Sequence, residues 1–359
     1  MKYVLIDGNN LAIRCSFANA ELMNSQGVPT GVHYGVFKSL LKIQDDFPNA
    51  QLLIAWDGKS KRRTLEANEG VKNGLVPSGY KENRPKGADK PAPLLSFESQ
   101  SDYLKKAIDK LGIPQIRMPD YEADDIIAAY CHKLTGEHET VDNSIVIITS
   151  DRDYYQLLSN NVVIFDAMKN MTISKALWEK ENGLGIDHVI SVGAFSGDAS
   201  DNIFGVPGWG DNTAIKALQK HGSIKAVYED MEAQVKKARE DYPDDISDED
   251  FKELSEAKTQ KGTSVWPQVT RNLPYLGVAL ACHRGKIKLQ KRTVMALIFK
   301  DRIRLAYSLK RMDKKIPNLP DVPSLQKDLD KLEEYCDYYE MPSLWAVIKQ
   351  EEGVATLYT

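Results

Sequence analysis

The sequence predicts an α/β protein whose mostly parallel central sheet is flanked by helices. Short apolar segments of strand length alternate with longer segments of helical periodicity through the first half of the chain. Acidic residues stand at, or just after, the ends of several predicted strands. Strand–helix alternation is typical of parallel sheets covered on both faces, in which the functional crevice lies beyond the carboxyl ends of the strands. The fold class therefore indicates where a site would form.

The elements of this sheet follow from the apolar periodicity. The predicted strands are residues 3–6, 52–56, 113–118, 144–149 and 162–165. The predicted helices between them are residues 33–44, 97–111 and 124–134. Residues 58–96 interrupt the alternation, because they are polar, basic and poor in strand-forming residues. A long segment of this kind beside a crevice is more often a functional lid or flap than a structureless loop.

The second half of the chain is predicted to be mainly helical. Helices at 187–195 and 213–220 flank a glycine-rich hairpin at 205–210, and a basic helical segment covers 300–315. Residues 229–256 carry a dense mixture of charges, which predicts solvated helices or partly disordered chain.

Composition narrows the class of protein. With 359 residues, 42% of them hydrophobic and 27% charged, the chain can hold one large domain or two ordinary ones. The apolar runs are too short to span a membrane and the N-terminus has no signal-peptide pattern, so we expect a cytoplasmic protein. The four cysteines lack metal-binding spacing, which disfavours zinc and disulfides. The net charge of −4 conceals basic clusters at 59–63, 81–90, 284–292 and 310–315, and local clusters decide phosphate binding.

Acidic residues are the most informative feature. Nine of them lie at predicted strand ends or on one predicted helical face: Asp7, Asp57, Glu122, Asp124, Asp125, Asp151, Asp153, Asp198 and Asp201. Two carboxylates about 4 Å apart repel by roughly 4 kcal/mol near a protein surface. Magnesium and manganese ions prefer carboxylate oxygens, and two such ions can hold a phosphate, ionise a water and stabilise a leaving oxygen. The set therefore predicts metal-assisted phosphodiester hydrolysis.

Each acidic motif also has a plain structural interpretation. Residues 7–10 read as a turn after a strand. Glu122 is placed on the loop before a helix whose first turn holds Asp124 and Asp125, where the helix dipole favours negative charge. Asp151 and Asp153 would point the same way on extended backbone, or residues 150–153 could be the capped start of a helix. It is the occurrence of all the motifs in one fold that has no simple structural explanation.

Basic and glycine-rich motifs point to a nucleic acid. Tyr80, Lys81 and Arg84 would present an aromatic ring and two cations on one helical turn, so that a base can stack while the cations take phosphates. Closely spaced glycines before a helix suit backbone N–H groups that meet a phosphate. Trp209, at the tip of the glycine hairpin, is either a buried anchor or a nucleic-acid contact, and we favour the anchor.

In this order the motifs resemble those of the 5′-nucleases, the family of flap endonucleases, phage 5′→3′ exonucleases and the exonuclease domain of bacterial DNA polymerase I. The match spans about residues 1–225, and its most specific part is the run GDASDNIFGVPGWG at 197–210. The resemblance implies an α/β nuclease core at 1–185 with a helical arch at about 58–96. It also implies a C-terminal helix–hairpin–helix DNA-binding region at 186–359, with a charged insertion at about 229–290.

The resemblance also implies a role for each motif. The first metal ion would be held by Asp7, Asp57, Glu122 and Asp124. The second would be held by Asp151, Asp153 and Asp198, with Asp125 and Asp201 assisting. Lys81 and Arg84 would be the catalytic cations that contact the scissile phosphate. DNA contacts are expected from Tyr80, Arg62, Arg63, Gly205, Val206, Gly208, Gly210 and Lys216.

We therefore expect a 5′-nuclease that uses two Mg²⁺ ions, for which Mn²⁺ can substitute, and that acts in DNA replication or RNA primer removal in a bacterial or phage-infected cell. Its partners would be 5′ flaps, 5′ overhangs and RNA–DNA primers. The resemblance also allows for K⁺ at the helix–hairpin–helix element, a single-strand-binding protein and a monomeric state. Two alternatives stay open. A compact ribonuclease of a related acid-cluster fold would lack the hairpin and arch, and a silent DNA-structure-binding protein would not need the intact acids and Lys81.

Overall fold

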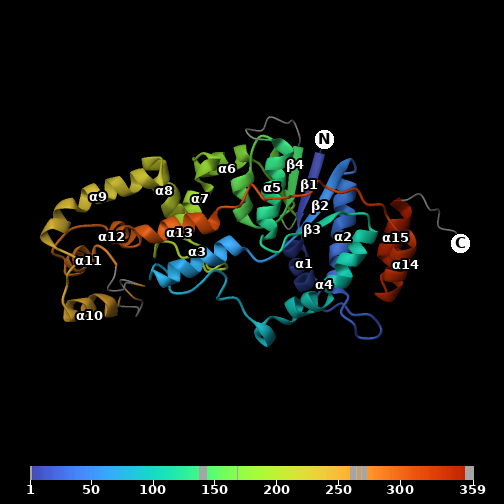
Figure 1. The fold of residues 1–359 in the computed structure, drawn as a ribbon, viewed down its shortest axis with the longest axis horizontal. Coiled ribbons are helices and arrows are strands. Elements are labelled where there is room, and N and C mark those ends of the chain that lie inside the picture. The colour runs from blue at the N-terminus through green and yellow to red at the C-terminus, as the bar shows by residue number, and fades with distance from the viewer. Residues whose placement is uncertain are drawn as a thin grey trace. The chain divides into compact units, whose positions relative to one another are not determined.

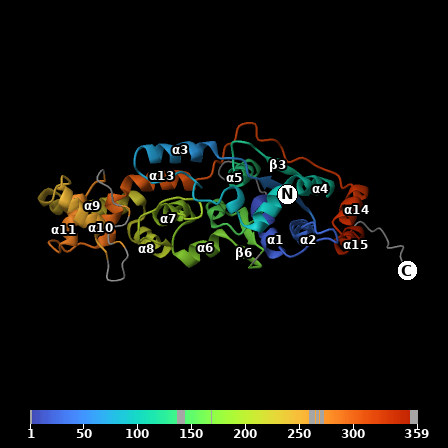
Figure 2. The same ribbon diagram turned by 90° about the horizontal axis from the view of Figure 1, so that it is seen from below.

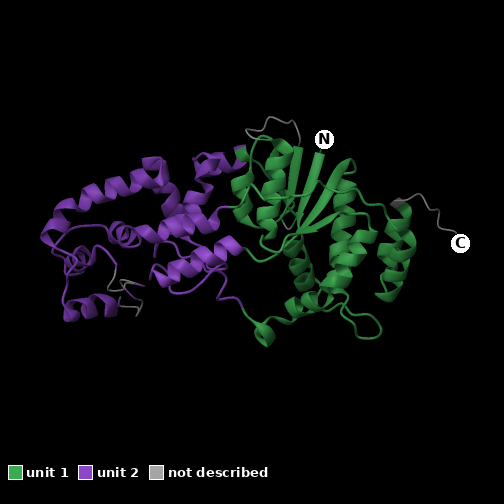
Figure 3. Ribbon diagram, viewed as in Figure 1, with its two compact units in different colours: residues 1–60, 85–175, 312–359 green, residues 61–84, 176–311 purple. Residues whose placement is uncertain are grey.

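The computed structural model is shown in two perpendicular views in Figures 1 and 2. It describes residues 2–136, 144–167, 169–258, 264, 268 and 273–351. The chain forms two compact units, which are coloured in Figure 3: unit 1 comprises residues 1–60, 85–175 and 312–359, and unit 2 comprises residues 61–84 and 176–311. Both units are discontinuous in sequence, so they do not follow a single boundary near residue 185. The division into a nuclease core and a DNA-binding region stays a prediction.

Unit 1 is built on a six-stranded sheet with the order β3-β2-β1-β4-β5-β6 (Figure 1). Its strands are β1 (Lys2–Asp7), β2 (Ala50–Trp56), β3 (Gln115–Arg117), β4 (Ser144–Ile148), β5 (Val162–Asp166) and β6 (Met171–Ile173). The first five are parallel to their neighbours, as predicted, whereas β6 pairs antiparallel with β5. The sequence did not predict β6, because a three-residue edge strand has no apolar run to reveal it.

Helices cover this sheet because its central strands are apolar on both faces. The helices of the unit are α1 (Gly8–Ala18), α2 (Gly31–Asp46), α4 (Ala92–Lys110), α5 (Ala123–Thr135), α14 (Leu329–Tyr338) and α15 (Pro342–Glu351). Val4 and Ile6 join a core with side chains of α1, α2 and α4. Leu5, which lies between them, is fully buried, and α5 contacts β1 and β2.

The segment that follows β1 corrects the sequence analysis. The plain structural interpretation of residues 7–10 was a turn, but α1 begins at Gly8, and Asp7 is its N-cap. Gly8 packs directly on β2, where an added Cβ would lie 2.7 Å from Ile54 and 2.8 Å from Trp56. The same short polar residues that favour turns also favour helix caps, and tertiary packing decided between the two.

Unit 2 is helical in its described part. Its helices are α3 (Lys61–Lys72), α6 (Lys175–Asn182), α7 (Val189–Ser196), α8 (Asp211–His221), α9 (Ile224–Asp241), α10 (Asp248–Glu256), α11 (Leu276–His283), α12 (Lys291–Ile298) and α13 (Lys300–Lys310). The helix–hairpin–helix element is α7, the loop 197–210 and α8. Trp209 is buried and stacks on Phe195 with ring centroids 4.9 Å apart, which confirms the anchor interpretation.

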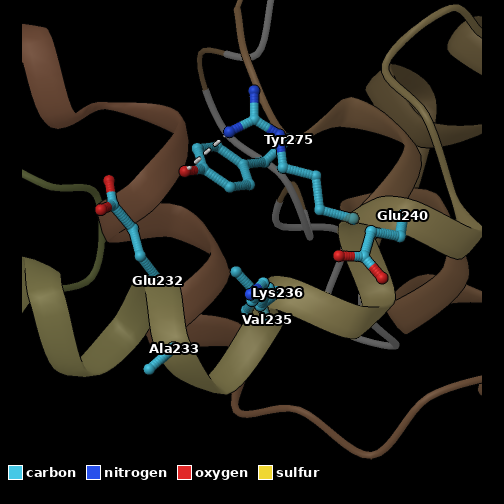
Figure 4. A pocket seen from close by; sticks show the side chains of 7 residues that line it. Glu232, Ala233, Val235, Lys236, Glu240 and Tyr275 are labelled. Carbon is cyan, nitrogen blue, oxygen red and sulfur yellow. Dashed lines mark hydrogen bonds between the residues drawn. The ribbon is translucent and has the colours of Figure 1, made fainter.

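The charged segment 229–290 contains the end of α9 and the helices α10 and α11 in its described part. Figure 4 shows a hollow of about 460 Å³ that is lined mainly by α9. The Arg239 guanidinium lies 4.4 Å from the centroid of the Tyr275 ring and donates a hydrogen bond to its hydroxyl over 3.2 Å. Arg284 pairs with Glu253 over 2.6 Å and so joins the end of α11 to α10. None of the predicted site residues lines the hollow. Across the described residues, no helix combines the length and the hydropathy that a membrane span needs.

The C-terminal helices α14 and α15 lie side by side (Figure 2) and are joined to the sheet unit by a buried aromatic cluster. His33 of α2 is fully buried, is hydrogen-bonded to the Tyr335 hydroxyl and lies 2.6 Å from the Gln100 side-chain oxygen. Its ring also packs on Tyr339, with centroids 3.9 Å apart. The cluster attaches the last described helices to α2 and α4.

This cluster predicts a pH-dependent stability. Burial lowers the pKa of His33 to about 4, and the hydrogen bond with Gln100 only partly opposes the shift. A neutral His33 therefore stabilises the fold above pH 6.5, and this contribution is lost as the pH falls towards 4. We expect the free energy of unfolding at pH 5 to be about 2 kcal/mol lower on this account. Urea unfolding at pH 7 and pH 5 measures it, and His33→Gln should show a smaller difference between the two. An equal pH dependence in both proteins would contradict the assignment.

Candidate active site

The carboxyl ends of four neighbouring parallel strands gather the acids of unit 1. Asp7 ends β1, Asp57 follows β2, Glu122 and Asp124 follow β3, and Asp151 follows β4. Since β3, β2, β1 and β4 are adjacent and parallel, these ends meet at one edge of the sheet. The structure thus places these predicted residues of unit 1 in one region.

Asp7 lies at the centre of this group. Its carboxyl is buried and accepts hydrogen bonds from the Asn10 amide over 2.9 Å and from the Tyr154 hydroxyl over 3.0 Å. Burial and the charges of Asp57 and Asp151 together raise the pKa of Asp7 to about 8, against the opposing effect of these hydrogen bonds. Burial and the neighbouring acids also raise the pKa of the Tyr154 phenol. The carboxyls of Asp57 and Asp151 therefore lie close enough to Asp7 to act on it electrostatically.

Two asparagines join the strand ends, and sequence reasoning missed both. The Asn9 side-chain oxygen accepts a hydrogen bond from the Asp57 amide over 3.1 Å. The Asn10 oxygen accepts from the Ser150 amide over 3.3 Å and from its hydroxyl over 3.1 Å. Asn9 and Asn10 therefore fix the loop after β1 to the loops after β2 and β4. The signal was the pair of amide side chains directly after a strand-ending acid.

Gly58 allows the loop after β2 to meet the loop before α5. Its amide donates to the Tyr121 carbonyl over 2.8 Å, and the Lys59 amide donates to the Pro119 carbonyl over the same distance. A Cβ at Gly58 would lie 2.1 Å from the Met118 carbonyl oxygen. Only glycine permits this approach.

The loop after β2 also holds the start of α5. The Asp57 carboxylate accepts a hydrogen bond from the Ala123 amide over 2.9 Å. Glu122 is the N-cap residue of α5, and Asp124 lies in its first turn, as predicted. The close approach at Gly58 therefore sets the positions of three predicted metal ligands.

Asp151 and Asp153 do not lie on extended backbone. Asp151 is the N-cap of a 3-10 helix, Arg152–Leu157, and its carboxylate accepts from the Asp153 amide over 2.8 Å. The extended interpretation was wrong and the capped helix start was right. The same helix carries Tyr154, whose hydroxyl donates to Asp7, so the cap of Asp151 also positions the partner of Asp7.

Asp125 has a structural contact within unit 1. Its side chain is fully buried and accepts a hydrogen bond from the Asp313 amide over 2.8 Å. The adjacent Met312 amide donates to the Gln156 side chain over 3.0 Å. Both contacts fix the segment that leads towards the C-terminal helices. Asp125 therefore anchors this segment, and the assisting metal role that the resemblance implies for it stays a prediction.

The remaining two acids belong to unit 2 and lie in a tight turn. Asp198 and Asp201 were predicted on one helical face, but α7 ends at Ser196, and Asp198 pairs with Ile203 across an antiparallel bridge. Lys310, which is buried, bonds the Asp198 carboxylate over 2.7 Å. Partial burial raises the pKa of Asp198, but Lys310 and hydrogen bonds from Ser200 outweigh it and lower the pKa to about 2.

The side chains of the basic motif at residues 80–84 contact the Asp201 carboxylate. Arg84 pairs with its carboxylate over 2.6 Å, Lys81 lies 3.8 Å away, and the Tyr80 hydroxyl donates to it over 3.0 Å. Residues 80–84 form a turn in which Lys81 has a φ of 54°, so the single helical turn predicted for them was wrong. The amide of Lys81 donates to the Asp201 carbonyl over 2.9 Å, which explains why a turn forms here.

The predicted DNA contacts divide into surface and interior residues. Gly208, Gly210 and Lys216 are exposed, and Gly208 has a φ of 82° that favours glycine. Arg63 is only 1% exposed and lies over the Tyr80 ring, which leaves it no surface for a phosphate.

Three further predicted contacts also have structural partners. Arg62 donates to the carbonyl oxygens of Ser308 and Arg311 at the end of α13. Val206 is buried, and Gly205 lies against the backbone of Phe195. The structure therefore gives Arg62 and Arg63 packing contacts, and their role in DNA binding stays a prediction.

The acids of unit 1 fit hard divalent cations by their chemistry. Carboxylate oxygens are the ligands such ions prefer, and a cation at this edge would relieve the repulsion that raises the pKa of Asp7. Within the described residues, no three of the aspartate, glutamate, histidine and cysteine side chains converge into a ready-made metal cage. The donor set therefore suits a metal ion, and the carboxylates would have to rotate towards it.

The chain combines a parallel α/β unit, which has acids at its strand ends, with a helix–hairpin–helix element. This combination is the one that the resemblance to the 5′-nucleases implies. Residues 2–183 match the family described as 5'-3' exonuclease, N-terminal resolvase-like domain. Residues 185–260 match the family described as 5'-3' exonuclease, C-terminal SAM fold. The chain belongs to the 5'-3' exonuclease family.

Several curated relatives agree with this family. A 5'-3' exonuclease of Aquifex aeolicus is 30% identical over 230 residues, which cover 64% of this chain and 72% of that protein. DNA polymerase I of Deinococcus radiodurans is 37% identical over 226 residues, which cover 63% of this chain and 21% of that protein. The chain spans about a quarter of the length of the polymerase relatives it matches.

Two solved structures share the fold. A structure of T5 5'-exonuclease with bound divalent metal ions (zinc) has a TM-score of 0.55 and 19% identity, and covers 94% of this chain and 99% of that chain. The catalytic core of Rad2 in complex with DNA substrate has a TM-score of 0.56 and 14% identity, and covers 97% of this chain and 92% of that chain. At these identities the likeness is one of fold.

Proposed function

We propose that the protein is a divalent-metal-dependent 5′-nuclease, a 5′→3′ exonuclease and structure-specific flap endonuclease that hydrolyses phosphodiester bonds in 5′-ended or branched DNA. The observation that carries this proposal is the gathering of acids from four neighbouring strand ends around the buried Asp7. Family membership supports the reaction type, and the metal ions and DNA in the related T5 and Rad2 structures support the cofactor and substrate class.

In this proposal the residues of unit 1 hold two Mg²⁺ ions, for which Mn²⁺ can substitute. Asp7, Asp57, Glu122 and Asp124 would hold the first ion, and Asp151 and Asp153 would hold the second, for which the resemblance also implies Asp198. Bound ions of this kind lower the pKa of a water and stabilise the leaving oxygen. The protein's own part is positional, since Tyr154 orients Asp7 and the two asparagines hold the loops together.

The basic motif of unit 2 supports a second part of the proposal. Lys81 and Arg84 would contact the scissile phosphate, because a phosphate can replace the carboxylate of Asp201 as their anionic partner. Asp201 would then keep the turn of Tyr80 in place until substrate arrives. The exposed glycines of the 205–210 loop and Lys216 would bind the duplex backbone, with K⁺ as an additional ion at this element.

We further propose the biological setting that the resemblance implies. Residues 1–185 would act as the nuclease core, with an arch at 58–96, and residues 186–359 as the DNA-binding region; the abutting family matches support a division near 184. Substrates would be 5′ flaps, 5′ overhangs and RNA–DNA primers during replication. We also propose that the protein is a monomer. It would act with a single-strand-binding protein in the cytoplasm of a bacterial or phage-infected cell.

A flap assay tests the proposed function. A labelled 5′-flap duplex is incubated with the protein in EDTA, in Mg²⁺ and in Mn²⁺, with the 5′ end either free or blocked. We expect binding in all conditions and cleavage only with a divalent ion. Binding without cleavage in every metal would support the silent DNA-binding alternative instead. Cleavage of single-stranded RNA in preference to the flap duplex would support the ribonuclease.

A further inference from the structure

Two basic side chains flank Asp57 at the acidic edge of unit 1. Lys105 belongs to α4, and Arg117 is the last residue of β3. The Lys105 ammonium nitrogen lies 4.7 Å from the centroid of the Trp56 ring, and Trp56 directly precedes Asp57. The Arg117 Nε donates to the Asp57 carbonyl over 2.9 Å. Both cations therefore stand beside a predicted metal ligand, and neither belongs to the predicted set of DNA contacts.

Hydrogen bonds fix this arrangement. The Trp56 indole nitrogen donates to the Gln115 side-chain oxygen over 2.8 Å. The Gln115 amide group donates in turn to the Lys105 carbonyl over 2.7 Å. These hydrogen bonds of Gln115, in β3, therefore link the Trp56 ring to the backbone of Lys105. Lys105 is half-buried over the ring, so its position is restricted more than that of a surface lysine.

The two cations are not used in ion pairs. Among the described residues, neither Lys105 nor Arg117 has a carboxylate oxygen within 4.0 Å, although Asp57 lies close enough to influence Lys105 electrostatically. Cations that served only to neutralise the acids would be expected to bond them directly, as Lys310 bonds Asp198. Hydrogen-bond donors on Lys105 and Arg117 therefore remain for another anionic acceptor.

We propose that Lys105 and Arg117 form a phosphate-binding pair that holds a DNA backbone phosphate next to the cleavage site. This inference rests on the proposed function. A phosphate offers charged oxygens to the compact ammonium of lysine and to the planar fork of arginine. A strand that delivers its scissile phosphate to metal ions beside Asp57 also brings an adjacent phosphate past these two cations. The pair would fix the register of the strand without reading its sequence.

The salt dependence of binding tests the pair. The variants Lys105→Gln and Arg117→Gln are compared with wild type on a 5′-flap duplex in EDTA, at several salt concentrations. Each is expected to reduce the slope of log affinity against log salt by about 1 and to weaken binding roughly three- to tenfold. Lys106→Gln is the matched control, because Lys106 is the next residue and lies over Tyr103 instead, 5.8 Å from its ring centroid. Slopes equal to wild type in both variants would overturn the proposal.

Replacing single phosphates by neutral methylphosphonates can show which phosphate Lys105 and Arg117 contact. Flap duplexes are prepared with one methylphosphonate linkage at successive positions around the scissile bond. At one position wild type should lose affinity while Lys105→Gln loses no more, because the contact is already absent. Lys105→Arg keeps a cation over Trp56 and should restore the slope. Additive losses at every position, or a variant that changes only the Mg²⁺ requirement, would show that the pair merely neutralises Asp57. If wild type neither binds nor cleaves the flap, it is the proposed function that fails.

Discussion

Asp151→Asn is expected to reduce flap cleavage by about 100-fold or more while flap binding in EDTA stays within about twofold of wild type. The substitution removes a charge from the proposed second metal site, and metal stabilisation of the transition state amounts to several kcal/mol, or about tenfold in rate for each 1.4 kcal/mol. Asparagine caps a helix about as well as aspartate does, so the 3-10 helix that carries Tyr154 should persist. Single-turnover cleavage and fluorescence anisotropy measure the two quantities separately.

A nearby acid provides the control for this experiment. Asp120 is exposed on the loop between β3 and α5 and lies outside the proposed ligand set. Asp120→Asn removes the same charge from the same edge of the sheet and should cleave at the wild-type rate. If Asp151→Asn loses binding together with cleavage, although its circular dichroism spectrum is unchanged, then Asp151 is not a purely catalytic residue.

Gly58→Ala is expected to have the largest effect on stability. Its Cβ would lie 2.1 Å from the Met118 carbonyl oxygen, so the loops after β2 and β3 must separate. Overpacking costs about 1–3 kcal/mol, and each of the two backbone hydrogen bonds at Gly58 and Lys59 contributes about 1 kcal/mol, which gives a loss of roughly 3–5 kcal/mol. Cleavage should fall as well, because Asp57 and Glu122 are no longer held together. Urea unfolding and the flap assay measure both effects.

A variant at a second glycine of the same unit distinguishes the cost of backbone strain from the cost of a steric clash. Gly27 has a φ of 77°, but a Cβ there would meet nothing within 4 Å. Gly27→Ala should therefore cost only the strain of a left-handed residue, about 1–2 kcal/mol, and leave cleavage unchanged. Equal losses of stability in the two variants would mean that the close approach at Gly58 is not the reason for its glycine.

Most strands of the sheet could be predicted from the sequence because the evidence for a strand is local. A run such as residues 144–149 is apolar at successive positions, and a short strand buried on both faces satisfies that pattern. Asp124 and Asp125 were placed in the first turn of a helix for an equally local reason, the charge preference of a helix start. These predictions needed only a residue and its near neighbours in the chain.

Two of the errors arose where a distant partner contributed to a local conformation. Asp198 and Asp201 have helical spacing, yet the bridge to Ile203 and the ion pair with Lys310 close a turn there. The spacing of residues 80–84 fits one helical turn, but the Lys81 amide donates to the Asp201 carbonyl instead. Spacing alone cannot reveal a partner more than 100 residues away.

By itself, the sequence predicted five of the six strands, the family and the candidate acids, because periodicity and motif order are properties of the chain. Only the tertiary structure decided which groups hold those acids in place. Asn9 and Asn10 acquire their roles because parallel strands bring the loops of Asp57 and Ser150 beside them. Gly58 matters because another loop passes within contact distance of its α-carbon. Such contacts depend on the packing of separate segments, and no residue pattern along the chain encodes their geometry.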